Sequence, residues 1–212
     1  AEAFRKLRGG VDYFLLHDRL IVNRCDDSVI KEVDGKPEFL RRSRGYVPEP
    51  VKLAFTSDKK VLAVGAELNV TCSVLTGDRC FSSQHIGDTT KVETLKYMQS
   101  AVEQLMHLLN LDSVDIVVHD LHPNYATTRI APRMAKKLGA RTLAVQHHHA
   151  HLTALMAECG LSEFVGIAAD GVGYGLDGTI WGGEVMFADL SSFKRVGGLM
   201  SQRMPGGNLT AI

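Results

Sequence analysis

Residues 146–188 read QHHHAHLTALMAECGLSEFVGIAADGVGYGLDGTIWGGEVMFA and contain three kinds of predicted element. Apolar residues at helical spacing predict a helix over 147–159, and the apolar run 164–169 predicts a strand. The glycine-rich stretch 170–178 is typical of a turn, and a second strand is expected over 183–188. This part of the chain is therefore expected to be a helix followed by a strand-turn-strand meander.

The chain before this stretch shows a related order, in which a meander precedes alternating helices and strands. The segments expected are strands at 61–66, 70–75 and 80–85, a helix at 91–111, a strand at 115–118, a helix at 125–138 and a strand at 141–146. A strand over 193–197 completes the second meander. A duplicated meander within an α/β chain indicates internal duplication and is the pattern of the actin-like ATPase superfold. We therefore expect an α/β protein with that superfold.

The first 50 residues differ in pattern from the rest of the chain. Two short apolar runs, 11–16 and 20–22, predict strands. The two prolines of Arg44–Pro50 predict an extended crossing between separate units. We place a domain boundary near residue 48, giving units 1–48 and 49–212, and we expect the chain to be a piece of a longer protein because only the start of the second copy is present.

Composition limits the classes of function. The 212 residues carry 24 Lys+Arg and 24 Asp+Glu, so the formal net charge is zero and a basic nucleic-acid coat is excluded. The cysteines lack CxxC spacing and suit reduced thiols in a cytosol; they are Cys25, Cys72, Cys80 and Cys159. No stretch approaches the ~20 apolar residues of a spanning helix. We expect a soluble cytoplasmic protein that binds neither nucleic acid nor membrane.

Four of the nine histidines lie within 147–151. On a helix His147 and His151, at i and i+4, project from one face and can hold one divalent metal, zinc or iron. Asp170, at the end of a predicted strand, is the best oxygen ligand in the chain. The zincin motif HExxH is excluded because His148 stands where its general-base Glu is needed. The alternative is a polar helix start whose histidines bond the backbone.

Glycines alternate after the predicted strand, at Gly171, Gly173 and Gly175. Alternating glycines let backbone N–H groups converge on an anion such as phosphate, and Asp170 could orient a magnesium-bound one. The spacing GxGxG leads into a strand, so it is not the GxGxxG of a dinucleotide site. The earlier turn from Gly65 to Thr71 would be a first phosphate loop. An ordinary glycine-rich hairpin is the alternative reading.

A basic cluster lies around the predicted boundary. Its members are Arg19, Arg41, Arg42, Arg44 and Lys52. Arginine forks match phosphate oxygens, so Arg41 and Arg44 are candidates for a phosphorylated substrate, although most such runs are solvated surface. Asp120 and His122 end a predicted buried strand, where α/β sheets gather ligands, but a satisfied turn would explain them equally well.

Six ordered motifs, taken together, resemble the HypF-type carbamoyltransferases that mature nickel-iron hydrogenases. They are LLHDRLIVNRCDDSVI, RRSRGYVPEP, VLAVGAELNVT with SSQHIGD, HDLHPNYATT, VQHHHAHLTALMAE and ADGVGYGLDGTIWGGE. The resemblance covers nearly the whole chain. It implies that residues 1–48 are the end of a YrdC-like domain and that 49–212 are the first half of the actin-like transferase domain.

The resemblance also implies a reaction. Carbamoyl phosphate is hydrolysed, ATP converts the carbamate to carbamoyl adenylate, and the carbamoyl group passes to the C-terminal cysteine of the partner HypE. His147, His151 and Asp170 would be the catalytic metal ligands, and Gly171, Gly173 and Gly175 would face the nucleotide. The cofactors would be a divalent metal, ATP and Mg²⁺.

The first predicted phosphate loop departs from the family pattern, because Asn69-Val70-Thr71 stands where many members have Lys-Asn-Thr. The residues left other hypotheses open: a related tRNA threonylcarbamoyl transferase, an antibiotic O-carbamoyltransferase, or a non-catalytic actin-like nucleotide-binding module. The run Trp181-Gly182-Gly183-Glu184 favours the hydrogenase family among these. We do not expect the 212 residues alone to carry out the full reaction.

Overall fold

A four-stranded mixed sheet organises the first half of the fold in this computed structural model, which describes residues 2–200 and 202. Its strands are β3 (Val51–Ala63), β4 (Ser73–Ser82), β5 (Ile116–Asp120) and β6 (Arg141–Val145), in the order β4-β3-β5-β6. β4 runs antiparallel to β3, whereas β5 and β6 run parallel to it. The parallel strands follow from the intervening helices, because a parallel connection needs a crossover segment.

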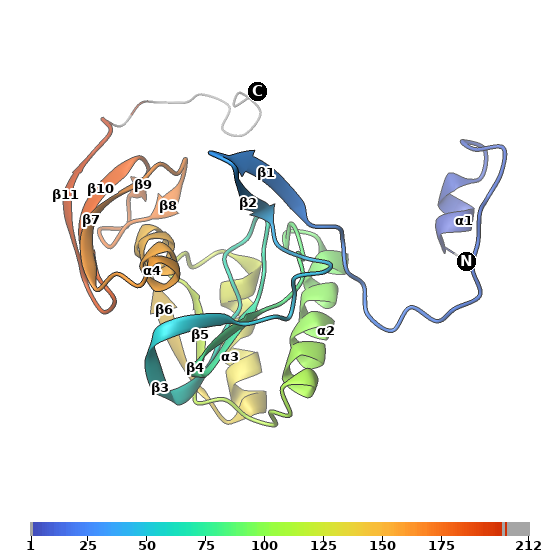
Figure 1. The fold of residues 1–212 in the computed structure, drawn as a ribbon, viewed down its shortest axis with the longest axis horizontal. Coiled ribbons are helices and arrows are strands. Elements are labelled where there is room, and N and C mark those ends of the chain that lie inside the picture. The colour runs from blue at the N-terminus through green and yellow to red at the C-terminus, as the bar shows by residue number, and fades with distance from the viewer. Residues whose placement is uncertain (1, 201, 203–212) are drawn as a thin grey trace.

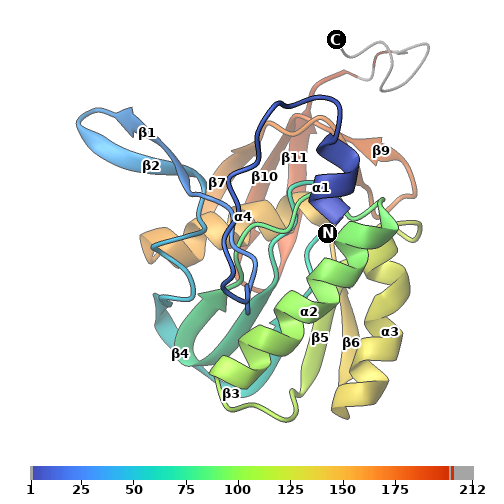
Figure 2. The same ribbon diagram turned by 90° about the vertical axis from the view of Figure 1, so that its right-hand side faces the viewer.

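Helices lie on both faces of this sheet (Figures 1 and 2). α2 (Val92–Leu108) and α3 (Ala126–Leu138) cover one face, and α2 buries Met98, Val102 and Leu105 against the strands. The helical repeat of apolar residues seen in the sequence accounts for this stripe. α4 (His147–Cys159) covers the other face and contacts β3. All three predicted helices are confirmed.

A second sheet lies beyond α4 (Figure 1). Its strands are β7 (Glu163–Ala168), β10 (Glu184–Asp189) and β11 (Phe193–Gly198), in the antiparallel order β11-β10-β7, and a short hairpin of β8 (Gly173–Tyr174) and β9 (Ile180–Trp181) precedes β10. Leu152 of α4 packs into the apolar cluster of this sheet. The predicted second meander is confirmed, and α4 separates it from the first sheet.

The predicted first meander of three strands is wrong, because the structure forms a hairpin of β3 and β4. The sequence Thr76-Gly77-Asp78 is typical of a turn. It lies inside β4, where Gly77 pairs with Ser57 and the register shifts on either side. Of the predicted third strand, residues 80–82 end β4, and 83–85 are not in a strand. Gly77 has a positive φ, and this lets β4 keep pairing with β3 through a turn-like sequence that usually ends a strand.

The predicted strands at 11–16 and 20–22 are also wrong. Within the described residues, 12–28 contain no strand, and side chains such as Leu15 and Leu20 are exposed. A strand needs a hydrogen-bonded neighbour, and no described segment pairs with this stretch beyond one bridge between Arg8 and Val11. The short helix α1 (Glu2–Leu7) precedes it, and Figure 1 shows both at the end of a long connection.

The region around the predicted boundary forms turns. A hairpin of β1 (Val29–Val33) and β2 (Lys36–Arg41) ends just before it. The carbonyl of Ser43 accepts hydrogen bonds from the N–H groups of Tyr46 and Val47, so 44–48 turn back and are not extended as expected. The division into 1–48 and 49–212 stays a prediction, and 203–212 lie outside the described residues.

The helices of the described chain include none with the length and apolar character that crossing a bilayer requires.

The four thiols differ in exposure, which predicts selective alkylation. Cys72 is fully buried, and burial raises its pKa to about 12, whereas Cys159 at the end of α4 is exposed. At about pH 8 only ~1 in 10,000 Cys72 side chains would be the reactive thiolate. Mass spectrometry after brief treatment of the folded protein with iodoacetamide should find Cys159 modified and Cys72 unmodified. Equal labelling of both would contradict the burial of Cys72, and labelling in denaturant is the control.

Candidate metal centre

The N-terminal half of α4 brings two histidines together on one face of the helix. Gln146 caps the helix, and its side-chain oxygen accepts a hydrogen bond of 2.9 Å from the N–H of His149. This cap fixes where the helix begins, so His147 and His151 lie one turn apart on the same face. Their Nε2 atoms are 3.3 Å apart.

Asp170 completes a three-residue cluster from the neighbouring strand. It follows β7, and its Oδ2 lies 2.8 Å from Nε2 of His147 and 3.6 Å from Nε2 of His151. Ligand atoms bound at about 2.05 Å to a tetrahedral zinc ion lie about 3.3 Å from one another. The three measured separations bracket that value, so these residues can present one ligand atom each to a single ion.

An unsatisfied oxygen supports the same fit. Oδ2 of Asp170 is buried and receives no hydrogen bond of suitable geometry from the residues described, although His147 Nε2 is close. A buried carboxylate oxygen without a partner is costly, and a bound cation would satisfy it. Two imidazoles and one carboxylate form the donor set of open zinc and iron sites.

Carboxylates on both sides of His147 affect its ionisation. Asp120, at the end of β5, lies 2.6 Å from Nδ1 of His147, and this hydrogen bond raises the pKa of His147 against the opposing effect of burial. Asp170 raises the same pKa further. Asp120 was noted at the end of a predicted strand, where ligands gather in α/β sheets, but its contact with the helix 27 residues later was not predicted.

The other two histidines of the cluster have structural partners. The side-chain nitrogen of Gln146 donates to Nδ1 of the fully buried His148 at 3.1 Å, and burial lowers the pKa of His148. Nε2 of His149 lies 2.9 Å from the carbonyl of Asp189 in β10. The alternative interpretation was that the histidines at the helix start bond the backbone. It describes His149. It does not describe His147 and His151, whose rings face Asp170.

The glycines after Asp170 have separate reasons to be glycine. A Cβ on Gly173 would lie 2.4 Å from Cε1 of His148, and one on Gly175 would lie 2.2 Å from Nε1 of Trp181. Gly171 differs, because no described atom lies within 4 Å of its Cβ position. Close packing accounts for the second and third glycines, and the first faces open space.

Glu184, which is buried, forms an ion pair with the exposed Arg195. Glu184 accepts hydrogen bonds from Nε and Nη2 of Arg195 at 2.5 and 3.0 Å and from the N–H of Gly182 at 3.0 Å. The guanidinium of Arg195 also stacks over the ring of Trp181. Glu184 therefore links β10 to β11 and to the turn between β9 and β10.

We expect Glu184→Gln to lower the free energy of unfolding by about 2 kcal/mol. Removing one partner of a buried pair costs about 3–5 kcal/mol, and Arg195 is partly exposed, so water compensates some of this loss. Urea denaturation measures the change. Glu103→Gln, which breaks the exposed pair with Lys137, is the matched control and should cost less than about 0.5 kcal/mol. Equal effects of the two substitutions would contradict the assigned role of Glu184.

The structure brings Arg41 and Thr71 together and leaves Arg44 apart. Arg41, Arg42 and Thr71 line one pocket of about 360 Å³ with Asn69 and His85, and no carboxylate is among the residues that line it. Nη1 of Arg42 is buried there without a described partner. Arg42 was predicted only as a member of the basic cluster and not as a separate candidate, and His85 was not among the candidates.

Arg44 contacts its own segment, since it donates to the carbonyl of Cys25 at 2.7 Å and pairs with the exposed Asp27.

Gly65 has positive φ, and a Cβ there would lie 2.9 Å from the carbonyl oxygen of Thr71. The turn from Gly65 to Thr71 thus closes on itself, and its glycine is required by that close approach.

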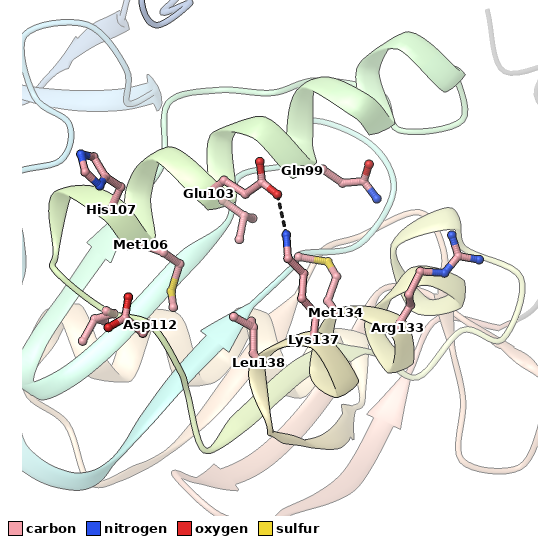
Figure 3. A pocket seen from close by; sticks show the side chains of 11 residues that line it. Gln99, Glu103, Met106, His107, Asp112, Arg133, Met134, Lys137 and Leu138 are labelled. Carbon is pink, nitrogen blue, oxygen red and sulfur yellow. Dashed lines mark hydrogen bonds and ion pairs between the residues drawn. The ribbon is translucent and has the colours of Figure 1, made fainter.

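Two further cavities lie in different parts of the fold, one between α2 and α3 and one between α4 and β7. A groove of about 510 Å³ between α2 and α3 is lined by apolar side chains such as Met106, Met134 and Leu138 and is crossed by the Glu103–Lys137 pair (Figure 3). It contains none of the candidate ligands. A cavity of about 300 Å³ borders His151 and Asp170 and is otherwise lined by apolar residues of α4 and β7. This second cavity gives the His151 and Asp170 side chains an opening to solvent.

The sheet order, the helices on both faces and the second sheet beyond α4 define a class of protein. These features are those of the Kae1-like form of the actin-like ATPase superfold. In this chain α4, the helix that carries the histidine cluster, lies between the two sheet units. Residues 56–158 match the HypF Kae1-like domain, and 166–212 match the second subdomain of the carbamoyltransferase Kae1-like domain. The chain belongs to the HypF carbamoyltransferase family.

Individual relatives agree with this assignment. The chain is 46% identical to the probable carbamoyltransferase HypF of Methanocaldococcus jannaschii over 98% of its length, and 40% identical to the carbamoyltransferase HypF of Synechocystis sp. over 97%. It spans 27% and 26% of those proteins.

Two solved structures are similar to the chain. T. kodakarensis HypF has a TM-score of 0.90 at 46% identity, covering 98% of this chain and 27% of that one. Full-length HypF in its phosphate- and nucleotide-bound form has a TM-score of 0.84 at 41% identity, covering 92% and 30%.

Proposed function

We propose that His147, His151 and Asp170 hold one divalent metal ion, zinc or iron, that serves carbamoyl transfer. The convergence of their three ligand atoms, with an otherwise unsatisfied carboxylate oxygen, is the observation that carries this proposal. When bound, such an ion supplies a Lewis acid that polarises a carbonyl or phosphoryl oxygen. Both histidines present Nε2 to the same point, and Asp170 supplies the negative charge that a divalent ion requires.

The second part of the proposal concerns the substrate. We assign the backbone of Gly171, Gly173 and Gly175 to the nucleotide of carbamoyl adenylate, formed from carbamoyl phosphate and Mg²⁺-ATP. Gly171 supports this best, because its face is open and it directly follows Asp170. Close packing leaves no space for a side chain at Gly173 or Gly175, and the backbone of Gly175 is already paired, its N–H with the carbonyl of Thr179 and its carbonyl with the N–H of Gly178. Phosphate and nucleotide are named for one solved relative of this family.

The arginine pocket is proposed to bind a phosphate group of the same substrates. Arg41 and Thr71 line it directly, while Gly65 shapes the turn that carries Thr71. Guanidinium groups without a carboxylate partner in a pocket favour an anionic ligand. Arg44 does not line this pocket. Its contribution is to hold its own segment in place through the hydrogen bond to the carbonyl of Cys25.

The acceptor is proposed to be the C-terminal cysteine of HypE, in the cytoplasmic maturation of nickel-iron hydrogenases. Membership of the HypF family supports this choice over tRNA or antibiotic acceptors. A thiolate attacking the carbamoyl carbon must come within ~3–3.5 Å of it. The cavity beside His151 and Asp170 leaves space for that approach.

The test follows radiolabelled carbamoyl phosphate in the complete protein that contains these residues. With ATP, label should appear on HypE and be absent from HypE whose C-terminal cysteine is replaced by alanine. The Asp170→Asn variant should transfer far less label than the unmodified protein. Label on tRNA, or on no acceptor at all, would overturn the proposed acceptor.

A further inference from the structure

Asp120 joins the strand β5 to the metal-binding face of α4. It is the last residue of β5, and only 5% of its side chain is exposed. Oδ1 accepts a hydrogen bond of 2.8 Å from the N–H of His122, and Oδ2 lies 2.6 Å from Nδ1 of His147. The hydroxyl of Thr128 donates to the Asp120 carbonyl and holds its backbone. The carboxylate is therefore fixed at both oxygens.

The two oxygens have different tasks. The bond from His122 is the local turn that a strand end needs, and it uses Oδ1 alone. Oδ2 has no part in that turn and faces an imidazole nitrogen at the start of α4. α4 follows β6, and β6 pairs with β5. A satisfied turn thus explains one oxygen of Asp120 and leaves the other to be explained.

The chemistry of the imidazole ring explains why Oδ2 of Asp120 faces Nδ1 of His147. A neutral imidazole that donates its Nδ1–H to a carboxylate has its free lone pair on Nε2. In His147 that is the atom facing Asp170 and His151. We propose that Asp120 is a positioning residue that holds neutral His147 in the Nδ1–H tautomer and fixes its ring so that Nε2 is presented to the ion. This inference rests on the proposed metal site.

The two histidine ligands are unequal in a way that fits this role. The side chain of His147 is 16% exposed and clamped by Asp120, whereas that of His151 is 60% exposed. Ordering His147 before an ion arrives removes part of the entropy cost of binding. A metal-ligating histidine whose other nitrogen donates to a carboxylate is also a stronger base toward the ion.

Asp120→Asn is the sharpest test because it separates the two oxygens. The amide oxygen of Asn can keep the turn with His122, but its NH₂ group then faces the Nδ1–H of His147, so two donors meet. Zn²⁺ and Co²⁺ affinities are measured in the complete protein by competition with a chromophoric chelator. We expect affinity to fall about 10- to 100-fold, the effect of losing an outer-shell partner, with a changed visible spectrum of bound Co²⁺.

Asp115→Asn is the matched control, since it changes a carboxylate at the other end of the same strand. Oδ2 of Asp115 accepts from the N–H of Lys60, far from the histidines. The Zn²⁺ and Co²⁺ affinities of the Asp115→Asn variant, and its spectrum with bound Co²⁺, should equal those of the unmodified protein. If the Asn variant does not fold, Asp120→Ser, whose hydroxyl can still accept from His122, is measured with the same expected loss.

The outcomes separate this inference from the metal site itself. Unchanged metal affinity and an unchanged Co²⁺ spectrum in a folded Asp120 variant overturn the positioning role and leave the site standing. Failure of the unmodified protein to bind either ion overturns the proposed site and the inference together. A loss of affinity at Asp120 with none at Asp115 supports both.

Discussion

Replacing His147 and His151 together by alanine is expected to reduce the bound metal of the protein to background. The substitution removes two of the three ligand atoms that converge in the structure, and a single carboxylate cannot retain a transition metal at micromolar protein concentration. Loss of an outer-shell partner alone weakens metal sites about 10- to 100-fold, so loss of two direct ligands must exceed that range. Elemental analysis after dialysis measures the change.

The control removes the same number of imidazoles from elsewhere. His17 and His107 are both exposed, and neither belongs to the cluster. The double variant His17→Ala/His107→Ala should keep the metal content of the unmodified protein. Equal metal in the His147/His151 variant and in the unmodified protein would refute the site. Because His151 is exposed and α4 is held by Leu152 and Met156, we expect the variant to remain folded.

The substitution Gly173→Ala is expected to have the second largest effect, lowering the free energy of unfolding by about 2–3 kcal/mol. The new methyl group would lie 2.4 Å from Cε1 and 2.9 Å from Nδ1 of His148, and 3.0 Å from Cβ of His147. His148 is fully buried and hydrogen-bonded to Gln146, so its ring has little room to move. Overpacking of this kind costs about 1–3 kcal/mol, and displacement of His147 should also weaken metal binding.

Gly171→Ala provides the comparison two residues away. No described atom lies within 4 Å of the added methyl group, and Gly171 does not have positive φ, so stability should change by less than about 0.5 kcal/mol. Urea denaturation of both variants measures the difference. Similar unfolding midpoints for the two would show that the loop does not pack on His148 as the structure has it.

Much of the fold follows from local patterns. The helices at 92–108, 126–138 and 147–159 repeat apolar residues every three or four positions, and each forms where the sequence predicts it. The errors fall in strands and in the connection at 44–48, which turns back and is not extended. A turn signal at Gly77 was absorbed into β4, and the apolar runs at 11–16 and 20–22 form no strand because no described neighbour pairs with them.

The amino-acid sequence by itself determined the pairing of His147 with His151, because a helix brings residues four apart onto one face whatever surrounds it. Only the tertiary structure decided that Oδ2 of Asp120 reaches His147 and that Arg41 shares a pocket with Thr71. These contacts join segments about 30 residues apart in sequence, through the order in which strands pair and the face on which α4 packs. The order of the strands depends on which faces of the sheet become buried, and no short sequence motif specifies that order.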